Sequence, residues 1–244
     1  MPKTEAISIT YSRCNDFARE AEWNEWYDNV HIPDGHAVGG FWTATRWEIT
    51  SRPPGGYSAL GFTHLNIKET AGPNAVERMR PEKPGIVDTW RAKGRLHPTQ
   101  GVIATMPFRA IGRWKDKPAP SPRTTGLYLV FTTCTDPRVE DEWNEWYDNV
   151  HVPDVMECGF AYAVTRWVRV DYHPFQTNYL GIYEIEDPDP DAAVRRMAQH
   201  SPTLRPRGRV HPNHCGGMNF TVRPVGKYAG IGSHALVPAS RQAP

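Results

Sequence analysis

A long internal repeat is the feature that most constrains how this chain can fold. Residues 22–34 read EWNEWYDNVHIPD and residues 142–154 read EWNEWYDNVHVPD, so twelve of thirteen positions recur at a spacing of 120. We call these two segments the repeated blocks. Solenoid repeats have periods of roughly 20–50 residues. The longer period therefore predicts a tandem duplication of one small domain within the 244 residues.

Further matches trace the two copies along the chain. In chain order they are Cys14 with Cys134, Thr45-Arg46-Trp47 with Thr165-Arg166-Trp167, Leu60-Gly61 with Leu180-Gly181, Ala75 with Ala193, and His97 with His211. The spacing is 120 for the first three pairs, then 118, then 114. Much of the sequence between these islands differs. The near-identity of the blocks therefore indicates that their residues are needed for more than the formation of a helix.

Composition places the chain among water-soluble globular proteins. Hydrophobic residues make up 39% and charged residues 23%, and the net charge is +1. This balance gives no bulk attraction to nucleic acid or to an anionic membrane. No apolar run reaches the roughly 18 residues of a membrane span, and no secretory signal opens the chain, so we expect a cytoplasmic protein. The four cysteines show no CxxC spacing and are expected to be reduced thiols.

Both halves predict the element order β-α-β-β-α-β, which is the ferredoxin-like plait. The expected strands are 6–11, 43–50, 57–67 and 102–110 in the first half, and 126–131, 163–171, 178–186 and 218–224 in the second. The first helix of each half follows Asp16 or Asp136, and we expect it to end near His31 because Pro33 disfavours helical angles at Ile32. The second helices begin near 75–79 and 191–199.

The halves define the domain organisation. We predict a first ferredoxin-like repeat at 1–111, a proline-rich linker at 112–125, a second repeat at 126–228 and a C-terminal tail at 229–244. A plait leaves one sheet face bare, so two copies are needed to cover it. The expected fold class is α+β.

The pattern W-x-x-WY-x-x-x-H-x-P-D, followed by a small-residue loop and a strand with A-T-R-W, resembles the dimeric α/β-barrel superfamily, particularly its EthD-like branch. The resemblance covers about the first 70 residues of each half. It implies two plaits packed sheet to sheet within one chain, as an intramolecular barrel with a cavity for a small hydrophobic molecule. Members of this superfamily include cofactor-independent isomerases, cyclases and decarboxylases, monooxygenases, and haem-dependent relatives.

Two rows of side chains run along the helix of the repeated block. Trp23, Trp26, Tyr27 and Val30 form an apolar stripe, which we expect to pack in the core. A polar row contains Asn24, Asp28 and His31 at i, i+4 and i+7, and it recurs as Asn144, Asp148 and His151. We propose each histidine as a general base, its aspartate as the group that orients it, and Tyr27 or Tyr147 as an acid. The alternative is that each histidine caps the helix end.

The remaining candidates flank the blocks and are expected to bind substrate. They are His36, His64, Asp34, Asp154, Arg46, Arg166, Trp47 and Trp167. Both arginines have an alternative role in an ion pair with a helix acid. His36 has no counterpart in the second half, and the alignment places Glu184 opposite His64. We therefore expect the working site in the first half and a degenerate site in the second. His97 and His211 are expected to anchor loops.

Motifs for nucleotide, zinc-hydrolase and serine-esterase chemistry are absent from the sequence. The leading hypothesis is a cofactor-independent lyase, cyclase or isomerase that acts on a small aromatic or polyketide-like molecule, with no metal and no cofactor. A monooxygenase or haem-dependent enzyme and a non-catalytic ligand-binding barrel are the alternatives, since a single axial histidine has no spacing signature. A homodimer of the tandem chain is left open.

Overall fold

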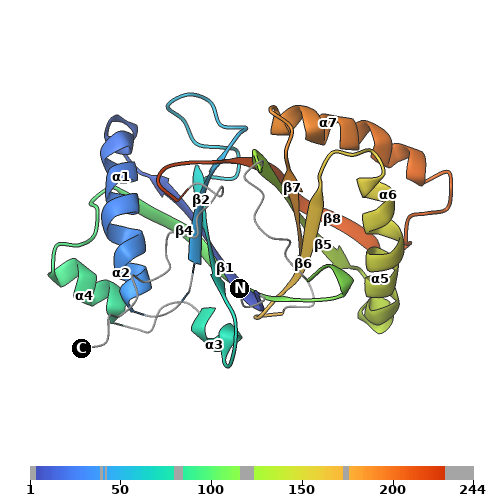
Figure 1. Ribbon diagram of the computed structural model, residues 1–244, viewed down its shortest axis with the longest axis horizontal. Coiled ribbons are helices and arrows are strands. Elements are labelled where there is room, and N and C mark those ends of the chain that lie inside the picture. The colour runs from blue at the N-terminus through green and yellow to red at the C-terminus, as the bar shows by residue number, and fades with distance from the viewer. Residues whose placement is uncertain are drawn as a thin grey trace, which may run out of the picture. The chain divides into compact units, whose positions relative to one another are not determined.

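The computed structural model describes residues 4–38, 41, 43–79, 85–115, 124–172 and 176–228. The chain is α+β and divides into two compact units (Figure 1). Unit 1 holds the described residues of Met1–Phe108 and Pro224–Pro244, and unit 2 holds those of Arg109–Arg223. The strands are β1 (Ala6–Cys14), β2 (Thr43–Ile49), β3 (His64–Thr70), β4 (Gln100–Ala110), β5 (Gly126–Cys134), β6 (Ala163–Arg169), β7 (Tyr179–Ile185) and β8 (His214–Pro224).

As the sequence predicts, helices follow the first and third strands of each half. The α-helices are α1 (Glu20–Trp26), α2 (Ile32–Ala37), α3 (Ala75–Met79), α4 (Ile86–Ala92), α5 (Glu140–Trp146), α6 (Val152–Met156) and α7 (Pro190–His200). Two π-helical turns, η2 (Tyr27–His31) and η5 (Tyr147–His151), join α1 to α2 and α5 to α6. Short 3₁₀ turns are η1 (Phe17–Arg19), η3 (Arg113–Lys115), η4 (Pro137–Val139) and η6 (Ser201–Leu204).

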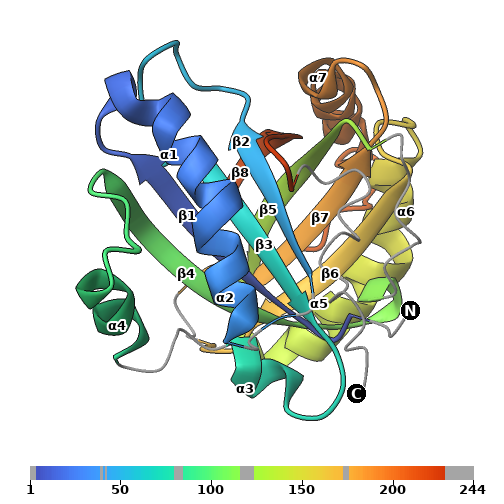
Figure 2. The same ribbon diagram turned by 60° about the vertical axis from the view of Figure 1, so that its left-hand side comes forward.

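The two units share one strand order. In unit 1 neighbouring strands run β4-β1-β3-β2, and in unit 2 they run β8-β5-β7-β6. β3 pairs antiparallel with β1 and β2, and β7 pairs antiparallel with β5 and β6. The element order expected of each half is therefore found in each unit. In unit 1 the long helix of α1, η2 and α2 lies along one face of β1 and β3 (Figure 2).

The register of the third strands corrects one alignment. Ser12 pairs with His64 in unit 1, and Thr132, which is 120 positions after Ser12, pairs with Tyr179 in unit 2. The counterpart of His64 is thus Tyr179, and the predicted match of His64 with Glu184 is wrong. The cause is the longer connection from β2 to β3, which runs from 50 to 63, while the connection from β6 to β7 runs from 170 to 178.

The helix of the repeated block does not end at His31. The N–H of Ile32 donates to the carbonyl of Tyr27, five residues back, and α2 continues to Ala37. Pro33 lies in the first turn of α2, where its missing N–H costs no hydrogen bond. The π turn supplies the extra residue that lets the helix pass the proline, and such turns are common at functional sites. Because His31 lies inside this longer helix, the alternative role of capping the helix end does not apply to it.

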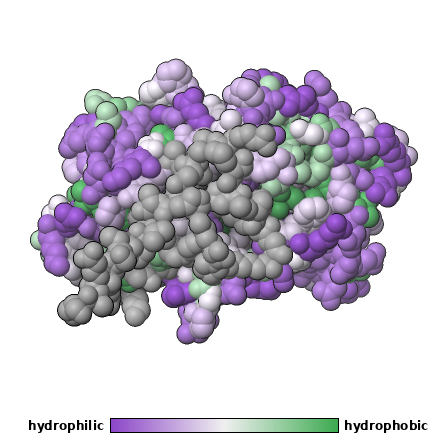
Figure 3. Space-filling model, in the orientation of Figure 1, coloured by the Kyte–Doolittle hydropathy of each residue, from purple (hydrophilic) through white to green (hydrophobic). Residues whose placement is uncertain are grey.

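The apolar stripe of the block packs into each core, as expected. Trp23 and Tyr27 are buried in the core of unit 1, and Trp143 and Tyr147 are buried in the core of unit 2. The visible surface of the described residues is mostly hydrophilic, with smaller hydrophobic patches (Figure 3). Burial of these large aromatic side chains contributes a large share of the apolar area that stabilises each unit.

The units do not coincide with the predicted repeats. The segment after β4 belongs to unit 2, and the segment after β8 belongs to unit 1, so each unit is completed by chain from the other half. The start of the predicted linker, residues 112–115, forms part of unit 2. Positions 116–123 and the predicted tail at 229–244 lie outside the described residues.

Across the described residues, every helix is too short or too polar to cross a lipid bilayer.

Candidate functional site

Asp28 and Asn24 bind Arg46, which is 1% exposed, and they do not orient His31. Arg46 Nη1 donates to Asp28 Oδ1 at 2.7 Å, and Nη2 donates to Asn24 Oδ1 at 2.6 Å. The guanidinium also lies 4.4 Å from the centre of the Tyr27 ring. The predicted Asp28–His31 pair is therefore a wrong interpretation, and the alternative of an ion pair between Arg46 and a helix acid is the one found.

Unit 2 repeats this arrangement. Arg166 Nη1 donates to Asp148 Oδ1 at 2.5 Å, and Nη2 donates to Asn144 Oδ1 at 2.8 Å. The Arg166 guanidinium lies 4.0 Å from the centre of the Tyr147 ring, and burial raises the pKa of that tyrosine. Because the buried arginine needs both partners, the recurrence of Asn-x-x-x-Asp in the block has a structural cause.

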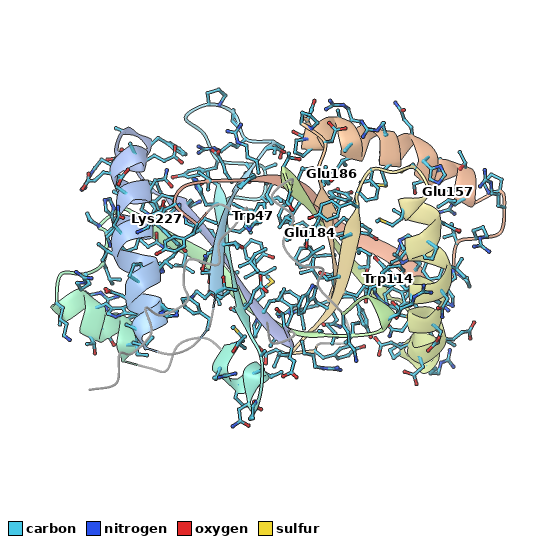
Figure 4. All side chains as sticks on the ribbon, in the orientation of Figure 1. Trp47, Trp114, Glu157, Glu184, Glu186 and Lys227 are labelled. Carbon is cyan, nitrogen blue, oxygen red and sulfur yellow. The ribbon has the colours of Figure 1, made fainter. Side chains whose placement is uncertain are left out.

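A backbone strap completes each buried pair. The N–H of Lys227 donates to Asp28 Oδ2 at 2.7 Å, and the N–H of Arg113 donates to Asp148 Oδ2 at 2.8 Å. Trp114 Nε1 also donates to the carbonyl of Asp148 at 2.9 Å. Figure 4 shows Lys227 beside the helix that begins with α1, and Trp114 beside the helix that begins with α5. We call 111–114 and 225–228 the straps.

Glycine makes the close approach of each strap feasible. Gly226 has φ +70°, and Gly112 has φ +64°. A Cβ at either position would collide with the carboxylate of Asp28 or Asp148. Sequence reasoning missed this feature, although a signal was present: Ile-Gly-Arg-Trp at 111–114 and Val-Gly-Lys-Tyr at 225–228 recur at the spacing of 114 already seen for the histidine loops.

The aspartates that end the blocks also form structural ion pairs. Asp34 accepts two hydrogen bonds from Arg95, at 2.8 and 2.6 Å, and Asp154 accepts two from Arg209, both at 2.8 Å. Hydrogen bonding to the arginine lowers the pKa of each carboxyl group. These pairs tie the end of each block to the loop that carries His97 or His211. The geometry therefore assigns Asp34 and Asp154 to loop anchoring.

A cavity of about 790 Å³ lies in unit 1 between the helix of the block and the sheet. Its described lining residues are Ser8, Thr10, His31, Gly35, Val38, Phe41, Lys68, Arg78, Met79, Val87, Trp90, Arg91, Leu96, His97, Pro98, Gln100, Val102 and Thr105. The volume is within the roughly 300–1,000 Å³ of small-molecule sites. Of the thirteen block residues 22–34, His31 is the one that lines this cavity. This location singles out His31 for a ligand-binding role.

The His31 ring is kept neutral. Burial lowers its pKa to about 3, and the nearby charges of Lys68 and Arg46 lower it further in the same direction. The ring contacts Trp26 and Tyr27, with centroids 5.0 and 4.7 Å away, and it has no hydrogen-bond partner among the described residues. A neutral imidazole with a free nitrogen can accept a proton or coordinate a metal.

Several predicted candidates lie away from the cavity lining. His36 contacts Phe41, and the buried His64 is 2.9 Å from Thr63 Oγ1 through Nδ1. Trp47 donates to Thr45 at 2.8 Å, and Trp167 repeats this bond in unit 2 with Thr165 at 2.9 Å. The described lining residues include none of these four side chains, nor Tyr27, Asp28 or Arg46. The expectation that His36 and His64 enrich the site is therefore not met.

Larger side chains fill the equivalent region of unit 2. The register places Tyr128 where unit 1 has Ser8, and Tyr183 where it has Lys68. Tyr128, Tyr183 and Phe160 are 7%, 2% and 2% exposed, and their ring centroids lie 5.2–6.3 Å apart. His151 retains a depressed pKa of about 3 because of burial, and it packs 5.0 Å from His214. The two units therefore differ in side-chain size at these positions, and a working site in the first half alone stays a prediction.

Sequence reasoning missed most of the cavity wall. Trp90 and Val87 come from α4, a helix that the sequence pattern did not predict, and Lys68 comes from the middle of β3.

Among the described residues, no group of three or more His, Cys, Asp or Glu side chains is placed to hold a metal ion.

No protein-family model matches the chain, and no curated protein sequence matches it. Solved structures do resemble it. A crystal structure provisionally named a chlorite dismutase has a TM-score of 0.57 and 11% identity, covering 91% of this chain and 95% of that one. A DypB variant from Rhodococcus jostii RHA1 in complex with haem has a TM-score of 0.55 and 10% identity, covering 92% and 94%. At these identities the likeness shows a shared fold and nothing further.

A third structure, a haem-binding protein from Thermus thermophilus, has a TM-score of 0.48 and 11% identity, covering 93% of each chain.

Proposed function

We propose that the unit 1 cavity binds haem, that His31 would be the residue that holds its iron, and that the protein is a haem-dependent, monooxygenase-type enzyme of small hydrophobic molecules. One observation carries this proposal: His31 faces the cavity as a neutral imidazole without a hydrogen-bond partner among the described residues. Neutral imidazole is the form that ligates iron. The solved structures with the same fold include a DypB variant in complex with haem, which supports the choice.

The residues of the cavity fit such a group. Its wall is apolar on the side of Phe41, Met79 and Trp90, which suits a large planar ring. Arg78 and Arg91 also line the cavity and could pair with the carboxylates of haem. The volume of about 790 Å³ is at the upper end for small-molecule sites.

The protein's own residues would hold the ligand and control the proton on His31. Trp26 and Tyr27 pack against its ring and restrict its orientation. Burial and the charges of Lys68 and Arg46 keep a proton off the ring, so that a nitrogen lone pair stays available. Haem would supply the redox chemistry that no side chain here can perform.

The cofactor-independent acid–base hypothesis has weaker support. A general base is most effective when its pKa is near the working pH, and a pKa of about 3 makes His31 a poor base. Its expected partner Asp28 is bound to Arg46 and the strap. Neutral His31 and the apolar wall also suit a barrel that only stores a hydrophobic ligand, which would bind but show no turnover.

We extend the proposal to the origin and assembly of the chain. It is a tandem duplication in the EthD-like branch, with two plaits that form an intramolecular dimeric α/β barrel. The shared strand order of the units and the coverage above 90% of two whole structures support this arrangement. A cytoplasmic location and a homodimer of the tandem chain stay predictions.

A haemin titration tests the function. We expect the purified protein to take up one haemin per chain with a Soret band, and His31→Ala to lose that band. His151→Ala is the matched control, because its histidine has the same local sequence but faces the filled region of unit 2. Equal binding by both variants, or no uptake by the wild type, would overturn the proposal.

A further inference from the structure

We infer that the sheet side of the unit 1 cavity is an anion site, in which Lys68 and neighbouring hydroxyl groups receive a carboxylate, sulfonate or phenolate of a hydrophobic ligand. The inference rests on the proposed function only in taking the unit 1 cavity as the working site. It adds the chemical class of the substrate: an aromatic or polycyclic molecule with one acidic group at its buried end.

The strand register gathers these groups on one face. Ser8 on β1 pairs directly with Lys68 on β3, so their side chains lie side by side. Thr10 follows two positions after Ser8 on the same face, and its hydroxyl is 3.3 Å from that of Thr105 on β4. All four residues line the cavity. They form what we call the polar floor.

The polar floor lies in a cavity whose described lining combines apolar and basic side chains. No Asp or Glu occurs among the described residues that line the cavity, whereas Lys68, Arg78 and Arg91 all do. Lys68 Nζ lies 5.5 Å from the centre of the Phe41 ring. Val38, Val87 and Val102 are 41–56% exposed at positions that also line the cavity. An apolar body with a negative charge at its inner end matches this distribution.

Unit 2 provides an internal comparison. Tyr128 replaces Ser8, Val130 replaces Thr10 and Tyr183 replaces Lys68, so the ammonium group and the Thr10 hydroxyl have no counterpart, and bulky phenol rings stand in place of Lys68 and Ser8. The floor is therefore specific to the unit that has the cavity. A purely structural role of Lys68 in the shared fold would not explain this joint change.

Two dyes with one aromatic skeleton test the inference. 1-Anilinonaphthalene-8-sulfonate carries a sulfonate, and N-phenyl-1-naphthylamine lacks it, and both report binding by fluorescence. We expect Lys68→Met to weaken binding of the sulfonate dye by about 10- to 100-fold, the range of a charge-assisted hydrogen bond. The neutral dye should bind the variant as it binds the wild type. Lys68→Arg should keep most of the sulfonate affinity.

Lys93→Met serves as the control, because Lys93 is exposed and does not line the cavity. It should leave both dyes unaffected, and circular dichroism should show native spectra for all three variants. If Lys68→Met lowers the affinity for both dyes equally, or for neither, the anion site is refuted. If the wild type does not bind haemin, the haem proposal is refuted. The anion site is still tested by the dyes, because the dye comparison does not involve haem.

Discussion

Asp28 and Arg46 form an ion pair 2.7 Å long inside unit 1, and this pair explains why the aspartate of the block does not serve His31. The pair recurs as Asp148 and Arg166 in unit 2. A buried charge pair is strongly destabilising to break, because the remaining charge is left without a partner. The pair gives a structural reason for the recurrence of the asparagine and the aspartate in the two blocks.

Removal of the arginine should therefore be costly. We expect Arg46→Met to lower the free energy of unfolding by about 3–5 kcal/mol, measured by urea denaturation. Asp34→Asn is the control, since it breaks a pair whose Arg95 side chain is 44% exposed, and such a pair contributes only about 0–1 kcal/mol. Equal effects of the two substitutions would contradict the structural role assigned to the buried pair.

The strap glycines should be more sensitive than other glycines with positive φ. In Gly226→Ala the alanine has a left-handed backbone conformation, and its Cβ collides with the Asp28 carboxylate. In Gly55→Ala the backbone is also left-handed, at φ +62°, but the added Cβ has no neighbouring atom within contact distance. A non-glycine residue in that backbone region costs about 1–2 kcal/mol. We expect Gly55→Ala to show only this cost and Gly226→Ala to exceed it, as measured by thermal and urea unfolding. Similar losses of stability in the two variants would mean that the close contact between the strap and Asp28 contributes nothing to the effect.

Stability should fall as the pH drops from 7 to 5. The pKa values of His31 and His151 are about 3 in the folded protein, because burial disfavours the charged ring, and about 6.5 in the unfolded chain. The unfolded state therefore binds more protons below pH 6.5, and folding loses up to about 1.4 kcal/mol per pH unit for each such histidine. The loss should continue down to about pH 3.

Substitutions identify which histidines cause the pH dependence of stability. His31→Gln and His151→Gln should each flatten the dependence of the urea midpoint on pH between 7 and 5. His36→Gln is the control, because its side chain lies outside the cavity lining. If the wild type shows no dependence in this window, the two rings are not held neutral by burial.

Closing the cavity should abolish binding without harm to the fold. Ser8→Tyr introduces the residue that unit 2 has at the equivalent position, where Tyr128 is buried against Phe160. We expect the variant to melt close to the wild type and to lose affinity for haemin and for both dyes. Retained binding would show that the ligand site lies elsewhere in the chain.

The sequence predicted the class of fold well and the site only in part. The hydrophobic patterns and the spacing of 120 predicted the element order, and they placed Trp23 and Tyr27 in the core. They could not show that a π turn carries the helix past Pro33, because that depends on tertiary packing of the block. The alignment of His64 failed because the connection before β3 differs in length between the halves.

The site itself depends on contacts that local patterns do not encode. An aspartate three positions before a histidine favours a local pair, but Arg46 competes for Asp28 from a strand 18 residues away. In the sequence, nothing distinguishes Lys68 from other lysines in strands. Its position beside Ser8 follows only from the strand register. The sequence did not predict the straps, because residues 112–114 fall in the predicted linker and residues 225–228 at the end of the predicted second repeat.

The central claim is that the neutral imidazole of His31 is the group that coordinates the haem iron in the unit 1 cavity. Haemin titration of His31→Gly, with and without added imidazole, tests it most directly, because the free base can enter the space left by the side chain. We predict that His31→Gly binds haemin without a native Soret band and that imidazole restores the wild-type spectrum, while His151→Gly needs no imidazole. A wild-type spectrum for His31→Gly in the absence of imidazole would contradict the account.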